Sequence, residues 1–90
     1  MKLLFDINVE GFRRWVSRRL RYLGVKAIRV PPGMARCDRL IAWYAGRIGA
    51  VAVTRDRRFP CKNKIVLTST KYEKMWTELC RRLRERAMSK

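Results

Sequence analysis

The chain has 90 residues, of which 48% are hydrophobic, and its formal net charge is +16. This length predicts one domain spanning residues 1–90, and the apolar content excludes a disordered basic tail in favour of a packed core under a charged surface. The apolar runs are too short for a signal peptide or a membrane-spanning helix, so we expect no association with membranes.

The first predicted strand is the short apolar run from Lys2 to Phe5, which is followed by Asp6. Apolar residues then recur at spacings of three and four, which predicts a helix with one buried stripe and an arginine-rich opposite face. Asn8 is a candidate cap at the start of this helix, and Gly24 is a candidate stop at its end. The stripe expected to be buried consists of Val9, Phe12, Val16, Leu20 and Leu23.

A second strand is predicted from Val25 to Val30, where a Pro-Pro-Gly sequence stops it. Asp38 stands immediately before a second helical stretch that Gly49 ends. The all-apolar run from Ala50 to Thr54 is typical of a third strand that is covered on both faces, and Asp56 lies just beyond it. The apolar residues of the second helix are Leu40, Ile41, Tyr44, Ala45 and Ile48.

The last part of the chain predicts a fourth strand from Lys64 to Thr68 and a basic helix over about residues 71–88. Thr70 and Glu73 have the spacing of a capping box at the start of that helix. The side chains that we expect this helix to bury are Tyr72, Met75, Trp76, Leu79, Cys80 and Leu83.

Near-continuous apolar strands that alternate with amphipathic helices predict an α/β fold with a mostly parallel four-stranded sheet. Ligands of such sheets bind at the carboxyl ends of the strands, where Asp6 and Asp56 are expected.

The cysteines do not form a recognisable zinc or disulfide pattern. Cys37, Cys61 and Cys80 are an odd number without close spacing, and the chain has no histidine, so we expect no zinc. Three reduced thiols predict a cytoplasmic protein. The many arginines, together with the absence of His and Gln, are compatible with a thermophilic source.

Three segments carry recognisable motifs in a fixed order: LLFDINV at residues 3–9, CDRLI at residues 37–41 and VAVTRDRRF at residues 51–59. Together they resemble PIN-like domains, in particular the short subgroup with an LLxDxN opening, an SD helix start and a VTxDxxF segment. The resemblance covers roughly residues 1–68. It implies a three-layer α/β/α sandwich whose acidic residues hold Mg²⁺ or Mn²⁺ for RNA hydrolysis, as in toxins and RNA-processing nucleases. Carried over by position, Asp6, Asp38 and Asp56 would be the metal-binding and catalytic residues, with Asn8 supporting them.

The chain departs from that pattern in ways that diminish the acidic site. Ile7 and Arg58 stand where the subgroup usually has acids. Arginines at positions 55, 57 and 58 surround Asp56 and can satisfy its carboxylate without a metal. Each aspartate also has a structural interpretation: Asp38 as a helix cap, and Asp6 and Asp56 as members of ion pairs or as loop caps.

The charge predicts a polyanionic partner, because seven acids cannot neutralise 23 basic residues. Arginine binds phosphate through two hydrogen bonds and stacks on bases, which favours RNA. Exposed aromatic residues among Trp15, Trp43, Tyr44 and Phe59 could add base stacking. The predicted RNA-binding residues are Arg13, Arg14, Arg18, Arg21, Arg55, Arg57, Arg58, Arg81, Arg82, Arg84 and Arg86.

Two functions are therefore compatible with the sequence. The first is a structural RNA-binding protein, a stoichiometric component of a ribonucleoprotein such as the ribosome. The alternative is an endoribonuclease that depends on Mg²⁺ or Mn²⁺ and uses Asp6, Asp38 and Asp56. A DNA-binding domain is a weaker third interpretation, because no motif for reading base edges is present.

Overall fold

The computed structural model describes residues 1–88, with the elements in the predicted order. Residues 89 and 90, at the end of the expected domain 1–90, lie outside the described residues. The strands are β1 (Lys2–Phe5), β2 (Lys26–Arg29), β3 (Val51–Thr54) and β4 (Lys64–Val66). The helices are α1 (Glu10–Tyr22), α2 (Asp38–Ile48) and α3 (Tyr72–Met88), and 3₁₀ turns at Ile7–Val9 and Pro32–Met34 precede α1 and α2.

The four strands form one sheet in the order β2-β1-β3-β4, and every neighbouring pair is parallel. This confirms the α/β class and the four-stranded sheet, in which all of the pairs are parallel. Phe5 pairs with Arg29 on one side and with Val53 on the other. The carboxyl ends of the three strands are therefore aligned, and Asp6 lies at the same edge of the sheet as the residues that follow Thr54.

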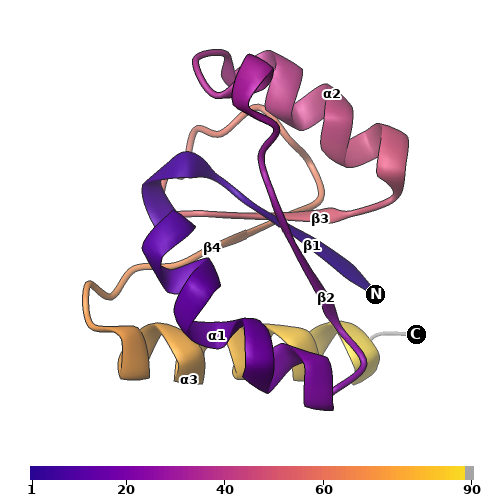
Figure 1. The fold of residues 1–90 in the computed structure, drawn as a ribbon. Coiled ribbons are helices and arrows are strands. Elements are labelled where there is room, and N and C mark those ends of the chain that lie inside the picture. The colour runs from indigo at the N-terminus through magenta and orange to yellow at the C-terminus, as the bar shows by residue number, and fades with distance from the viewer. Residues whose placement is uncertain (89–90) are drawn as a thin grey trace.

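Helices cover both faces of the sheet, as expected for three α/β/α layers. Figure 1 shows α1 and α3 on one face and α2 on the other. Side chains alternate between the two faces of a strand, so Leu3 and Phe5 of β1 pack with α1 and α3, whereas Leu4 packs with α2. Every residue of β3 is buried, which confirms that this strand is covered on both faces.

Most of the side chains that we expected to be buried are buried or half-buried, but Leu23 and Tyr72 are exposed, so the prediction was wrong for them. Leu40, an apolar residue of the second helix, is exposed as well. Leu23 follows the last residue of α1 and belongs to the turn that ends the helix. Leu40 points outward because Ile41 and Ala45 occupy the inner face of α2. Tyr72 is the first residue of α3 and lies at the margin of the core.

The helix ends were predicted better than the helix starts. Gly24 and Gly49 both adopt left-handed conformations, with φ of 72° and 68°, which confirms them as the residues that stop α1 and α2. Asn8 does not cap α1, because it lies within the 3₁₀ turn that precedes the helix. Asp38 does not cap α2 either: it is the first helical residue, and no side chain caps this helix from Cys37.

The capping box predicted for α3 is also wrong, because the helix begins at Tyr72, two residues after Thr70. A carboxylate from inside α3 stabilises the turn instead. Glu78 accepts hydrogen bonds from the backbone N–H groups of Thr68 and Ser69 and from the Thr68 hydroxyl.

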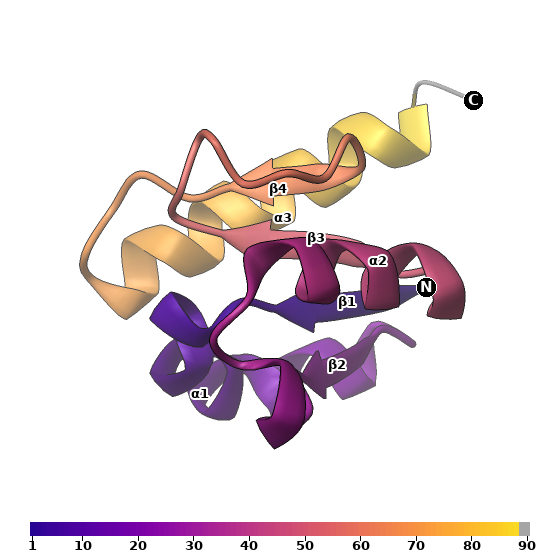
Figure 2. The ribbon, with the colours of Figure 1, turned by 90° about the horizontal axis from the view of Figure 1, so that it is seen from above.

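The connection between β3 and β4 contains no helix, although parallel neighbours usually require one. Figure 2 shows the strands side by side with this connection, residues 55–63, on the α2 side. Phe59 anchors it by packing in the cluster that contains Ile41 and Ala45. The Lys64 ammonium group donates hydrogen bonds of 2.6 Å and 2.8 Å to the carbonyl oxygens of Arg57 and Phe59. The connection is therefore held in place by the packing of Phe59 and by the hydrogen bonds of Lys64.

Candidate nucleic-acid interface and acidic site

Asp6 is the first residue after β1 and is only 6% exposed. One of its carboxylate oxygens accepts a hydrogen bond of 2.7 Å from the backbone N–H of Ile7 and so caps the 3₁₀ turn. The other oxygen accepts a bond of 2.8 Å from the hydroxyl of Thr54, the last residue of β3. Asp6 therefore joins the carboxyl ends of the two central strands.

Asp56 is connected to the same hydrogen bonds through Thr54. The Thr54 hydroxyl oxygen accepts a bond of 3.1 Å from the backbone N–H of Asp56. The Asp56 carboxylate in turn accepts a bond of 2.9 Å from the backbone N–H of Arg58, as aspartates in turns commonly do. We call this arrangement the Asp6–Thr54–Asp56 network. It confirms that both aspartates lie at the carboxyl edge, and it gives each of them a structural role.

Asp38 is exposed at the first position of α2 and has no hydrogen bond to Asp6, Thr54 or Asp56. Within residues 1–88, no three or more His, Cys, Asp or Glu side chains are grouped as they would need to be to hold a metal ion. The structure thus brings Asp6 and Asp56 together through Thr54 and does not add Asp38 to them as a third ligand.

The two aspartates still have the donor chemistry that a divalent cation requires. Each Asp6 oxygen accepts one hydrogen bond from the protein, and a carboxylate oxygen has a further lone pair. Mg²⁺ is typically held by one or two carboxylates and completes its shell with water. The side-chain oxygen of Asn8 lies at the same edge, where it accepts a long bond of 3.4 Å from the Arg55 backbone N–H.

An arginine-rich loop follows this network directly. Arg55, Arg57 and Arg58 are all exposed. Beside them lies a depression of about 400 Å³, which is lined by Arg55, Arg57, Val66, Leu67 and Thr68. Because Asp56 and Lys64 hold the backbone of this loop, its guanidinium groups are attached to a fixed segment.

The arginines of α1 that are predicted to bind RNA differ in how exposed their side chains are. Arg13 is only 17% exposed and donates two hydrogen bonds of 2.7 Å to the Glu10 carboxylate. This contact lowers the pKa of Glu10 and raises the pKa of Arg13. The guanidinium group of Arg13 is therefore occupied by an interaction within the fold. The exposed arginines of the predicted set on this helix are Arg14, Arg18 and Arg21.

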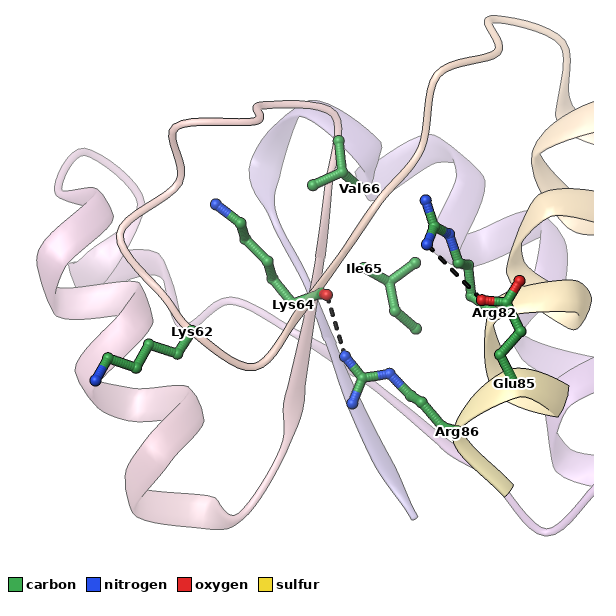
Figure 3. A pocket seen from close by; sticks show the side chains of 7 residues that line it. All are labelled: Lys62, Lys64, Ile65, Val66, Arg82, Glu85 and Arg86. Carbon is green, nitrogen blue, oxygen red and sulfur yellow. Dashed lines mark hydrogen bonds and ion pairs between the residues drawn. The ribbon is translucent and has the colours of Figure 1, made fainter. Parts of the chain in front are cut away.

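A second basic depression, of about 470 Å³, lies along the outer edge of β4 (Figure 3). Its cations come from Lys62, Lys64, Arg82 and Arg86. Arg86 donates hydrogen bonds to the carbonyl of Lys64 and to the side chain of Asn63, so it covers part of the open strand edge. The other predicted arginines of α3 are exposed: Arg81, Arg82 and Arg84.

The residues that are predicted to stack on bases differ in burial and in their contacts. Phe59 is buried, so it cannot stack on a base. Trp15 lies between Phe12, with ring centroids 6.1 Å apart, and the Arg19 guanidinium, 3.9 Å from its ring centre. Tyr44 is half-buried, whereas Trp43 is exposed.

Sequence reasoning missed two sets of residues. Thr54 was not singled out, although a hydroxyl residue at the end of an apolar strand and two positions before Asp56 is a usable signal. The basic residues in and before α2 were also left out, although two of them, Arg39 and Arg47, flank Trp43 at a spacing of four residues. The set is Arg36, Arg39 and Arg47, all exposed.

Among the described helices, none combines the length and the apolar character needed to cross a membrane. Comparison with protein-family models, with curated proteins and with solved structures gives no match. The resemblance to PIN-like domains therefore rests on the three motifs, and the α/β fold with its aligned acidic edge is compatible with it.

Proposed function

We propose that this protein is a PIN-like RNA-binding protein that acts as a stoichiometric structural component of a ribonucleoprotein such as the ribosome. The observation that carries the proposal is the excess of exposed arginine on several sides of the fold. Within residues 1–88, the ion pairs join only four arginines to two acids, Glu10 and Glu85.

The distribution of these arginines favours an RNA that surrounds the protein. Exposed arginines lie on α1, on α2, on the connection between β3 and β4, and on α3. These elements cover both faces of the sheet and its carboxyl edge. Phosphate contacts from many directions supply affinity without reading sequence, which suits a folded RNA.

A structural role is favoured over catalysis by the hydrogen bonds of the acidic site. Asp6 and Asp56 both stabilise local backbone, and Asp56 is flanked in its loop by one arginine before it and two after it. The three cysteines are free thiols, which supports a reducing, cytoplasmic environment.

The proposal is tested by measuring the affinity for a folded RNA at several salt concentrations. Replacing Arg55, Arg57 and Arg58 by alanine is expected to weaken binding and to reduce the slope of log K against log salt by about one unit per lost phosphate contact. The matched variant with lysine at the same three positions keeps the charge and should retain most of the slope. An affinity that does not depend on salt would refute the proposal.

The ribosomal form of the proposal has its own test. The native protein should remain on ribosomal subunits through a high-salt wash, at close to one copy per subunit. Loss at moderate salt would exclude a stoichiometric ribosomal role.

A second candidate, a Mg²⁺- or Mn²⁺-dependent endoribonuclease, is favoured by the Asp6–Thr54–Asp56 network beside an arginine-lined depression. A bound metal would activate water and stabilise the charge that develops on phosphate. RNA cleavage should then require the metal and disappear in both Asp6→Asn and Asp56→Asn. Asp38→Asn tests the third predicted ligand: cleavage that is also lost in this variant would add Asp38 to the site, and cleavage that is retained would limit the site to Asp6 and Asp56. Cleavage that persists in both network variants would exclude this site.

A further inference from the structure

Trp43 is a large aromatic side chain that the fold does not bury. It lies on the outward side of α2 with 59% of its surface exposed. No ring or cation–π contact to it is formed within residues 1–88, in contrast to Trp15, which has contacts with Phe12, Tyr72 and Arg19. Burial of an indole is strongly stabilising, and tryptophans that remain exposed are typical of binding surfaces.

The neighbours of Trp43 on the helix surface are cationic. Arg39 precedes it by four residues and Arg47 follows it by four, so both are adjacent to the indole on the same side of α2. Both are exposed, and neither forms an ion pair with another described residue. The acid of this helix, Asp38, lies at its first position, more than one turn away from Trp43.

Gly46 lies one turn after Trp43 and leaves the helix surface beside the indole uncovered. Glycine inside a helix is destabilising relative to alanine. A Cβ atom at this position would have nothing within 4 Å, so neither the packing of the fold nor its backbone conformation requires glycine here. Helical side chains lean toward the N-terminus, so a side chain at position 46 would cover the surface next to Trp43. Glycine leaves one side of the indole open.

We propose that Trp43, Arg39 and Arg47 form a stacking site for an unpaired nucleobase of RNA; the inference rests on the proposed RNA binding and specifies which part of the RNA is bound. The base stacks on the indole, and the phosphates on either side of it bind the two guanidinium groups. Bases in a continuous duplex are already stacked on one another, so the site takes a single-stranded, bulged or loop nucleotide.

The experiment compares two probes, an oligoadenylate and an abasic oligomer with the same ribose–phosphate backbone. Trp43→Leu keeps an apolar side chain without an aromatic face, and it is expected to weaken oligoadenylate binding roughly 5- to 100-fold. Its affinity for the abasic oligomer should not change. Trp43→Phe should recover part of the loss, because it restores a ring.

Two further variants on α2 distinguish base stacking from binding of protein at this surface. Gly46→Ala should raise the Tm, since alanine favours the helix, and at the same time weaken oligoadenylate binding. Leu40→Ala should leave RNA binding unchanged. If Leu40→Ala and Trp43→Leu instead abolish self-association of the protein and have no effect on either probe, the surface binds protein and the inference is wrong.

The experiment also distinguishes the failure of this inference from the failure of the proposed function. If the unmodified protein binds neither these probes nor the folded RNA of the salt titration, RNA binding itself is refuted. If it binds both probes equally and Trp43→Leu changes nothing, RNA binding stands and base stacking at Trp43 is refuted.

Discussion

At the scale of single residues, the polar groups of the carboxyl edge form hydrogen bonds with one another. The Thr54 hydroxyl is the central group, because it donates to Asp6 and accepts from the backbone of Asp56. Both Asp6 and Thr54 are buried, so any polar atom that loses its partner there cannot recover one from bulk water. The hydrogen bonds of this edge are therefore part of the stability of the fold.

Thr54→Val tests this role, since valine has almost the same shape without the hydroxyl. The variant leaves an Asp6 oxygen without its donor and is expected to lower the free energy of unfolding by about 1–3 kcal/mol. Urea denaturation measures the change, and Thr54→Ser, which keeps the hydroxyl, should lose much less. A Thr54→Val protein as stable as the original would contradict a structural network.

Glu78 connects stability to pH. Burial raises the pKa of this carboxyl, but the hydrogen bonds from Thr68 and Ser69 outweigh burial and lower it. Because the folded-state pKa is depressed, the stabilisation is complete above the unfolded pKa, near 4.5, and is lost as the pH falls through the folded value.

Glu78→Gln should therefore lower stability by about 1–2 kcal/mol at pH 7, where the charged hydrogen bonds are made, and the difference should shrink below about pH 4. Thermal unfolding across pH 3–8 measures both effects. Glu73→Gln on the same helix is the control and should follow the parent curve. A constant difference at every pH would show that the charge of Glu78 is not the cause.

At the scale of the elements, the sequence predicted most of the fold because the strands and helices have distinct patterns. Short, near-continuous apolar runs marked the strands, and a period of three to four residues marked the helices. The capping of α3 was mispredicted because the turn before it is stabilised by Glu78, which reaches Thr68 from inside the helix. The starts of α1 and α2 were mispredicted because neither helix is capped by a side chain. The convergence of Asp6 and Asp56 was predictable from strand direction, whereas their link through Thr54 depends on side-chain geometry.

The connection of residues 55–63 carries a prediction of its own. Lys64→Met removes the two hydrogen bonds to the Arg57 and Phe59 carbonyls and should loosen this segment. Trypsin cuts after arginine, so cleavage after Arg55, Arg57 and Arg58 is expected to become several-fold faster than in the parent protein. Lys62→Met is the matched control, an exposed lysine in the same connection. Equal cleavage rates in the two variants would show that Lys64 does not brace the loop.

At the scale of the whole molecule, a net charge of +16 affects stability and binding in opposite ways. Like charges within about 10 Å repel one another at low salt, and added salt screens them. The Tm should therefore rise by several degrees between about 10 mM and 500 mM NaCl. Over the same range the affinity for RNA should fall by orders of magnitude, because releasing counterions into a more concentrated salt solution gains less free energy.

Calorimetry and a binding titration on the same samples measure the two trends. Sodium sulfate at matched ionic strength is a useful comparison, because a divalent anion that binds arginine clusters should raise the Tm further. A Tm that does not respond to either salt would mean that the exposed arginines are too far apart to repel one another.

The strand order has a consequence for how the chain acquires its structure. In the sequence β1 precedes the other three strands of the sheet, but it occupies an interior position, where it pairs with β2 and β3, so its second neighbour is complete only when Thr54 has been made. The hydrogen bond from Thr54 to Asp6 joins residues 48 positions apart and cannot form earlier. A deletion of β1 would thus separate β2 from β3 and β4 instead of trimming an edge of the sheet, and a nascent chain must keep Leu3, Leu4 and Phe5 from associating wrongly until Thr54 has been translated.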